Sequence, residues 1–154
     1  MVGETLSGSK DETFKSSAME RGNELEPKAR QFFQFSTGLK VEEVGMCYPD
    51  ELRRYHASPD GLIVDQNKGL EIKCPLIPTA VEYLLGGKLP TAYVCQVQGS
   101  MMVTGCESWF FMSYYPGMKP LIIEVERDEK LISILKEEVE RFCFDVNELV
   151  KKLK

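Results

Sequence analysis

The chain has 154 residues, of which 43% are hydrophobic, and it carries a formal net charge of −5. This length suffices for one domain with its own hydrophobic core. No apolar run approaches the ~20 residues of a membrane-spanning helix, and the N-terminus lacks the apolar core of a signal peptide, so we expect a cytoplasmic protein without membrane contact. The five cysteines are odd in number and widely spaced, which favours reduced thiols over disulfides or a zinc site.

The N-terminal part of the chain predicts one helix. Residues 1–16 are mainly polar, and we expect a loose segment or a short helical fragment there. A helix is predicted over residues 17–36, because apolar residues recur on one face and Gly38 follows as a stop signal. These apolar residues are Leu25, Ala29, Phe32 and Phe33. Pro27 conflicts with a regular helix, so the helix should begin close to Pro27 or kink there.

Strand signals follow this helix. Residues 41–48 have the composition of a strand, and a turn at Pro49 and Asp50 leads into a second short strand that ends at residue 57. The next segment predicts a β-hairpin, because an aliphatic run at residues 62–64 and an alternating run at residues 70–73 flank turn-forming residues.

This hairpin brings Asp60 back beside Glu71. Strand side chains alternate between faces, so Glu71 and Lys73 share one face while Leu70 and Ile72 pack into the core. Two carboxylates offer hard oxygen ligands to a cation such as Mg²⁺, and the lysine adds a charge that could orient a water or a phosphoryl oxygen. The pattern is typical of a metal-dependent nuclease site, although each piece alone is more often a solvated hairpin face.

The flanking residues argue against a plain surface hairpin. Pro59 restrains the residue before it to extended geometry, Gly61 relaxes the backbone after the acid, and Pro75 ends the second strand. Beyond the hairpin, a helix is predicted over residues 79–85 and a glycine-containing loop follows it.

A further helix is predicted over residues 93–103, where an apolar stripe indicates core packing. Gln96 and Gln98 lie roughly 200° apart around such a helix, so only one of them can face the site. A strand is predicted over residues 108–114, where polar and apolar residues do not alternate, as expected for a strand buried on both faces. Another strand is predicted over residues 121–126. Asp128 should cap a long final helix, whose apolar stripe could serve the fold or a subunit contact.

Five strings occur in the order and near the spacing of a known family. They are SPDGL, LEIKCP, YVCQVQGSMMVTG, SWFFMSYYPGMK and VERDEK. From about Met19 to the C-terminus the chain resembles the phage lambda exonuclease family, also called the YqaJ viral recombinase nucleases, of the PD-(D/E)-x-K superfamily. The resemblance implies an α/β fold with a central mixed β-sheet flanked by helices and a restriction-endonuclease-like core. It divides the chain into two parts. Residues 1–18 form a polar N-terminal segment that could be part of a shortened helical region, and residues 19–154 form a single nuclease domain.

The resemblance also implies site residues. Asp60 and Glu71 would bind one or two Mg²⁺ or Mn²⁺ ions, with the Ile72 carbonyl as a further ligand, while Lys73 and Gln96 would position the attacking water. Glu26 stands where the family's helix supplies another acid, and a solvent-facing glutamate is the alternative. The family places one more acid near Asp50, which could equally be an ordinary turn residue. Because the family's chemistry uses no histidine, we expect His56 to be structural.

The function implied by the resemblance is 5′ to 3′ exonuclease digestion of double-stranded DNA in phage-type recombination. The enzyme would be a ring-shaped homotrimer, would act with a single-strand annealing protein, and would work in the host cytoplasm if phage- or virus-encoded. The acidic net charge conflicts with DNA binding unless basic side chains gather along the channel of the ring. Candidates for this lining, each an ordinary solvated side chain when taken singly, are Arg53, Arg54, Lys88 and Lys119.

Two alternatives to this function remain. A structure-specific or nicking endonuclease would use the same carboxylates, and a non-catalytic DNA-binding protein would keep the fold. In the family, an arginine in a longer N-terminal region grips the terminal 5′-phosphate, and no residue before Met19 matches it. Lys10 or Lys15 would supply only mobile point charges. We therefore expect little discrimination between 5′-phosphorylated and 5′-hydroxyl ends, and distributive degradation.

Overall fold

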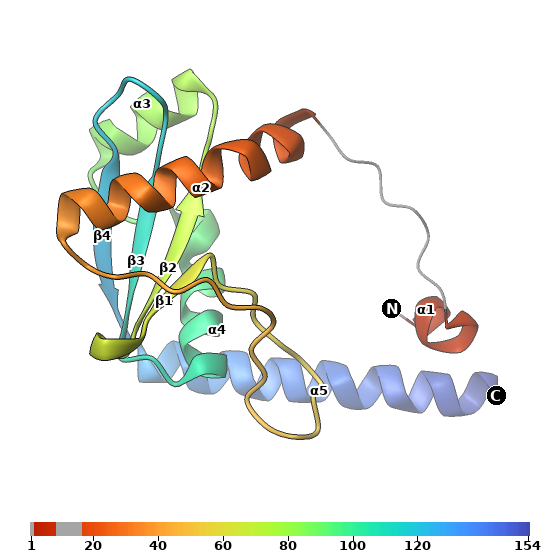
Figure 1. Cartoon of the computed structure of the whole chain (residues 1–154). Helices are drawn as coiled ribbons and strands as arrows, with labels where there is room; N and C mark the ends of the chain where they lie inside the picture. Colours follow the sequence, from red (N-terminus) through yellow and green to blue (C-terminus); the bar gives the residue numbers. More distant parts are fainter. Residues whose placement is uncertain (1, 9–16) are drawn as a thin grey trace.

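A computed structural model describes residues 2–8 and 17–154, and it places a mixed sheet between helices (Figure 1). Within the described residues, four strands form the sheet in the order β1-β2-β3-β4. Their bounds are Gly61–Ile63 for β1, Lys68–Lys73 for β2, Ser108–Ser113 for β3 and Leu121–Glu126 for β4. β2 and β3 are parallel, whereas the two outer pairs are antiparallel. The predicted fold class, an α/β protein with a mixed sheet flanked by helices, is confirmed.

The predicted hairpin is the β1–β2 pair, in which Gly61 lies opposite Leu70. A short 3-10 helix, η1 (Val64–Gln66), and Asn67 in the left-handed region with φ 52° reverse the chain between the two strands. Asparagine tolerates this region better than most residues, because its short polar side chain can hydrogen-bond locally. β1 pairs with β2 only as far as Leu70, so the edge of β2 beyond that residue has no strand beside it.

Helix α2 (Ser17–Thr37) covers one face of the sheet. Ala29 and Phe33 are fully buried there against Leu70 and other residues of the sheet. The helix predicted over residues 17–36 is therefore confirmed; of the two alternatives for Pro27, a start close to the proline is wrong, because the helix begins at Ser17 and continues through it. The Pro27 side chain is exposed, and the burial of the apolar face offsets the lost backbone hydrogen bond.

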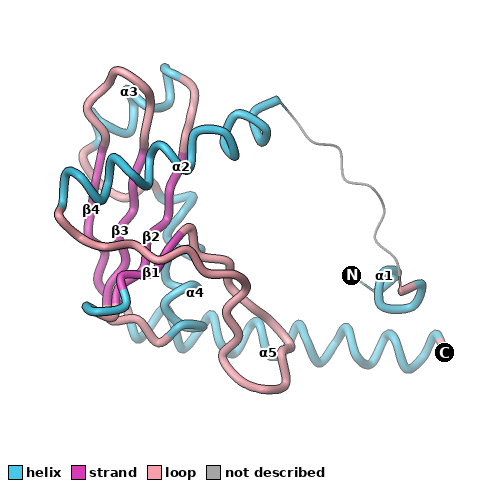
Figure 2. The backbone as a smooth tube through the Cα atoms, viewed as in Figure 1, coloured by secondary structure: helices cyan, strands magenta, loops and turns pink. Residues whose placement is uncertain are grey.

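The strands predicted over residues 41–48 and up to residue 57 are wrong. Most of this stretch is loop, as the tube in Figure 2 shows. Only two isolated bridges form, Glu42 with Leu62 and Cys47 with Ala57. A ladder needs a continuous partner, and β1 is only 3 residues long. Strand-like composition therefore yields single bridges here rather than a fifth strand.

Helix α4 (Val94–Thr104) packs on the opposite face of the sheet from α2. Its Val97 and Met101 are fully buried, and they form a core cluster with Trp109 of β3 and Ile132 of α5. The helices predicted over residues 79–85 and 93–103 are confirmed as α3 (Ile77–Gly86) and α4. The strands predicted over residues 108–114 and 121–126 correspond to β3 and β4.

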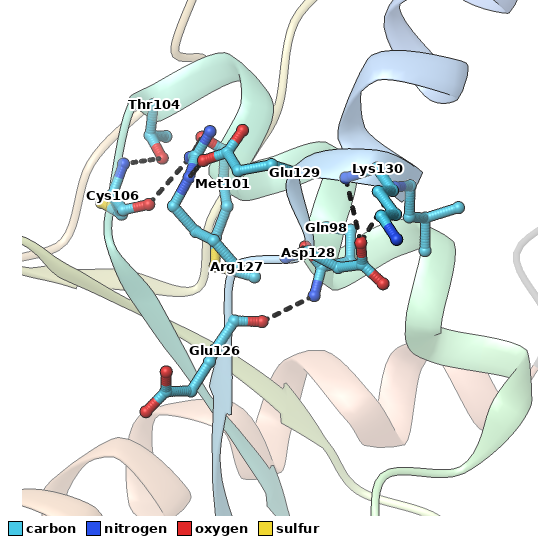
Figure 3. Close-up of polar contacts among 10 residues, drawn as sticks. Gln98, Met101, Thr104, Cys106, Glu126, Arg127, Asp128, Glu129 and Lys130 are labelled. Carbon is cyan, nitrogen blue, oxygen red and sulfur yellow. Dashed lines mark hydrogen bonds and ion pairs between the residues drawn. The ribbon is translucent and has the colours of Figure 1, made fainter.

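A polar junction fixes α4 to the turn between β4 and α5 (Figure 3). The Gln98 amide donates to the Glu126 carbonyl at 2.8 Å and accepts from the Asp128 backbone N–H at 2.9 Å. The Arg127 guanidinium donates to the carbonyls of Met101 at 2.7 Å and Cys106 at 2.9 Å, near the carboxyl end of α4. A cation at this end complements the partial negative charge of the helix terminus.

Helix α5 (Glu129–Leu153) begins as predicted at Asp128, whose side chain accepts from the backbone N–H groups of Lys130 and Leu131. Of its apolar residues, Ile132 and Val150 are buried, whereas Ile134 and Phe142 are 57% and 51% exposed in the single chain. Among the described residues, no helix combines the length and apolar character needed to cross a membrane.

Helix α1 (Val2–Ser7) contacts α5 and corresponds to the short helical fragment expected within residues 1–16. The remainder of that prediction, including Lys10 and Lys15, lies outside the described residues.

Candidate active site

A cavity of about 400 Å³ lies beside the carboxyl-terminal part of β2. The amino-terminal half of α2, the residue before β1, the end of β2 and the 3-10 helix η2 (Thr91–Tyr93) all contribute to its wall. The residues that line it are Met19, Gly22, Asn23, Glu26, Asp60, Ile72, Lys73, Cys74, Pro75 and Tyr93. Three of the predicted site side chains, Glu26, Asp60 and Lys73, thus reach the same cavity, together with Ile72.

Asp60 occupies the edge of β2 that β1 leaves open. Its Oδ2 accepts a hydrogen bond of 2.6 Å from the Ile72 backbone N–H, so the carboxylate takes the place of a strand partner. Burial, followed by the negative charge of Glu71, raises the pKa of Asp60 to about 6, although the Ile72 hydrogen bond opposes this rise. In a strand, the N–H and C=O of one residue point to the same edge, so the Ile72 carbonyl also faces this open edge.

Glu71 is the most buried of the predicted acids, with only 2% of its surface exposed. Its Oε1 accepts from Lys73 Nζ at 2.5 Å and from Gln96 Nε2 at 2.6 Å. Burial raises the pKa of Glu71, while the Lys73 charge and the two hydrogen bonds act in the opposite direction. Lys73 Nζ also lies 5.1 Å from the ring centroid of Tyr93, a cation–π distance.

Gln96 and Gln98 point to different parts of the molecule, as their separation around the helix predicts. Gln96 faces the site and Gln98 the β4–α5 junction. The Gln96 amide donates to Glu71, so in this structure it orients the carboxylate rather than standing free to hold a water.

Glu26 lies in the cavity wall and is partly buried, rather than being the fully solvated side chain of the alternative reading. Burial raises its pKa, and the charge of Asp60 adds to that rise. Its Oε1 lies 2.6 Å from Nη2 of Arg30, one helical turn further along α2. Sequence reasoning missed Arg30; the signal available was its i, i+4 spacing from Glu26.

Several other candidates lie outside the cavity wall. Asp50 is exposed and accepts from the Leu52 backbone N–H at 2.9 Å, which is turn chemistry. His56 is also exposed, and its ring centroid lies 5.8 Å from that of Tyr48. The side chains proposed to contact DNA are all exposed and do not line the cavity; they are Arg53, Arg54, Lys88 and Lys119.

Arg21, near the amino-terminal end of α2, is engaged by the backbone rather than free. It donates to the carbonyls of Cys74 at 2.9 Å and Pro75 at 3.0 Å, two residues of the cavity wall. These bonds tie α2 to the end of β2.

The donor set fits a hard divalent cation. Burial raises the pKa of Asp60, and the like charge of Glu71 adds to that rise, so a cation bound beside both carboxylates would relieve their repulsion. Mg²⁺ is usually bound through one or two carboxylates while it keeps several waters. In the described part of the chain, no three His, Cys, Asp or Glu side chains come together as a metal-binding cluster.

Residues 1–107 match the model of the YqaJ-like viral recombinase domain. The alkaline exonuclease LHK-Exo from Laribacter hongkongensis is similar in structure, with a TM-score of 0.90 and 33% identity over 99% of this chain and 78% of its own. LHK-Exo in complex with dAMP gives a TM-score of 0.91 and 34% identity, over 99% of this chain and 79% of its own.

Two further proteins are similar to the chain. The uncharacterized protein ExoD of Escherichia coli K12 is 33% identical over 78 residues, which are 47% of this chain and 90% of ExoD. A phage-related exonuclease from Haemophilus somnus 129PT shares the fold, with a TM-score of 0.77 at 16% identity over 99% of this chain and 80% of its own. By the family match and the likeness to LHK-Exo, the chain belongs to the YqaJ-like viral recombinase family.

Proposed function

We propose that this chain is a metal-dependent deoxyribonuclease that removes nucleotides from the 5′ ends of double-stranded DNA. The observation that carries the proposal is the convergence of three side chains: a short hairpin brings Asp60 and Lys73 to one cavity, and Lys73 pairs there with the buried Glu71 carboxylate. Family membership and the likeness to an alkaline exonuclease support a nuclease. LHK-Exo forms a complex with dAMP, which is the kind of product that stepwise digestion of DNA would release.

Asp60, Glu71 and the Ile72 carbonyl would hold Mg²⁺ or Mn²⁺. Such an ion lowers the pKa of a bound water and neutralises charge on the phosphodiester. Asp60 is held in place by the Ile72 N–H, and Glu71 by Lys73 and Gln96, so neither carboxylate needs to reorganise before the reaction.

Lys73 supplies a positive charge in direct contact with Glu71. In our proposal its ammonium group orients the attacking water or stabilises a phosphoryl oxygen as negative charge develops there. The Glu71 carboxylate on one side and the Tyr93 ring on the other restrict where the ammonium can lie. Gln96 acts through Glu71, and Glu26 adds a further carboxylate to the wall.

Outside the cavity, we assign DNA contact to exposed basic side chains, which would give local positive charge on a protein whose net charge is negative. These side chains are Arg53, Arg54, Lys88 and Lys119. We propose a homotrimer, consistent with the exposed Ile134 and Phe142 of α5, and a single-strand annealing protein as functional partner.

The test is digestion of end-labelled linear duplex by the purified chain, with Mg²⁺ and with chelator. We expect Mg²⁺-dependent release of 5′-terminal nucleotides and no attack on covalently closed circular DNA. Cleavage of the closed circle would instead establish an endonuclease. Full activity in chelator would remove the metal from the proposal, and no cleavage under any condition would overturn the nuclease assignment.

A further inference from the structure

Arg30 is a charged residue in the interior next to the cavity. Only 7% of its surface is exposed. Its three guanidinium nitrogens contact three different segments of the chain. Nε donates to the Asp60 carbonyl at 2.9 Å, Nη2 to Glu26 Oε1 at 2.6 Å, and Nη1 lies 2.5 Å from Glu43 Oε1.

This arrangement is costly to build. Burying a guanidinium costs several kcal/mol of desolvation free energy, and its ion pairs return about the same amount. A buried ion pair therefore need not add to the stability of the fold. Apolar residues of α2 already anchor the helix on the sheet, since Ala29 and Phe33 are fully buried. Arg30 is therefore not needed to attach α2 to the sheet.

The contacts of Arg30 have a more specific consequence for the site. One nitrogen fixes the side chain of Glu26, and another fixes the backbone of Asp60. The Asp60 side chain is fixed separately, by the Ile72 N–H. Arg30 thus links two acids that lie on different elements, α2 and the start of the hairpin, and sets the distance between them.

We propose that Arg30 is a positioning residue that holds Glu26 and Asp60 at the spacing needed to bind the divalent cation. The inference rests on the proposed function, in which Asp60 binds the metal and Glu26 adds a carboxylate to the cavity wall, and it takes Glu26 to act on the same ion. Arginine is required because its planar fork presents donors in three fixed directions, whereas a lysine offers a single mobile charge. The third guanidinium nitrogen, Nη1, pairs with Glu43, whose side chain is 75% exposed.

The experiment compares Arg30→Lys with Arg127→Lys in the full chain. Arg127 is a comparable control, because its guanidinium likewise contacts three groups, here two backbone carbonyls and one glutamate, but near the carboxyl end of α4 and outside the cavity wall. Mn²⁺ binding is measured by calorimetry without DNA, and the Mn²⁺ concentration for half-maximal cleavage is measured separately. Melting temperatures of both variants report any loss of fold.

Arg30→Lys should weaken Mn²⁺ binding about 10–100-fold, as is typical when a residue that orients metal ligands is lost. It should raise the half-maximal Mn²⁺ concentration in parallel, while Arg127→Lys stays within about twofold of the parent in both. Parental Mn²⁺ affinity in folded Arg30→Lys, or equal weakening in both variants, would overturn the inference and leave the nuclease proposal standing. A parent chain that neither binds Mn²⁺ nor cleaves DNA would overturn both.

If Arg30→Lys does not fold, the unaltered chain provides the second measurement. Nitrogen-15 NMR can follow the side-chain Nε–H groups of Arg30 and Arg127 while Mg²⁺ is added. The Arg30 signal should shift as Asp60 and Glu26 engage the ion, and the Arg127 signal should stay fixed. An Arg30 signal that does not move at saturating Mg²⁺ would contradict the inference.

Discussion

Asp60→Asn should make the metal-free protein more stable at neutral pH. The pKa of Asp60 is raised from 3.8 to about 6, first by burial and then by the charge of Glu71. The folded state therefore holds the proton more tightly than the unfolded chain does. The stability that this proton contributes is complete below about pH 4 and is lost as the pH rises through about 6. Above about pH 6, the lost stability amounts to about 3 kcal/mol, the free energy that a pKa difference of about two units represents.

Asparagine removes the charge and keeps an oxygen that can accept the Ile72 N–H, whose bond to Asp60 is 2.6 Å long. In chelator at pH 7.5, we expect the free energy of unfolding of Asp60→Asn to exceed that of the parent by about 3 kcal/mol, and at pH 4.5 by about 1 kcal/mol. Urea unfolding can be followed by the fluorescence of Trp109, the single tryptophan, which is fully buried.

Asp50→Asn is the control, because Asp50 is an exposed turn residue whose contact with the Leu52 N–H an asparagine can keep. Because Asp50 is exposed, the effect of this substitution on stability should be small. Adding Mg²⁺ should stabilise the parent and not Asp60→Asn. Equal stability of Asp60→Asn and the parent at pH 7.5, or a gain of the same size at pH 4.5, would refute the reasoning.

Three further predictions concern single side chains. Lys73→Ala should slow cleavage of end-labelled duplex at least about 100-fold with little loss of DNA affinity, because one transition-state contact is removed; a near-parental rate would contradict the assignment. Gly69→Ala should lower the free energy of unfolding by about 1–3 kcal/mol, since the added Cβ would lie 2.2 Å from a ring carbon of buried Trp109; an unchanged urea midpoint would show that the ring can move. Burial raises the pKa of the Cys74 thiol to about 11, so at pH 8 about one in a thousand of these thiols is ionised. Mass mapping should therefore find Cys74 alkylated much later than exposed Cys95, and equal rates would argue against the raised pKa.

The local features of the site follow from the sequence alone. Turn chemistry between two apolar runs specifies the hairpin, and the period of two puts Glu71 and Lys73 on one face of β2. The resulting register, with Gly61 opposite Leu70, brings Asp60 to the edge of the same strand. These features depend on residues close together in the chain, so pattern and spacing predict them.

The same reasoning failed where the partner is distant. Residues 41–48 have strand composition, yet the sequence does not reveal that β1 is too short to continue a ladder with them. The helix over residues 17–36 was predicted, but the alternative that it begins close to Pro27 was wrong, because the burial of its apolar face decides whether an interior proline is tolerated.

Tertiary structure alone decided how the acids are held. Glu71 meets Gln96 across 25 residues, and Arg30 meets the Asp60 carbonyl across 30. Which side of a helix faces a given loop depends on how the helix rests on the sheet, and that packing is set by the whole core. A sequence pattern specifies the periodicity of each element, whereas the distances between elements arise only when their apolar faces are buried together.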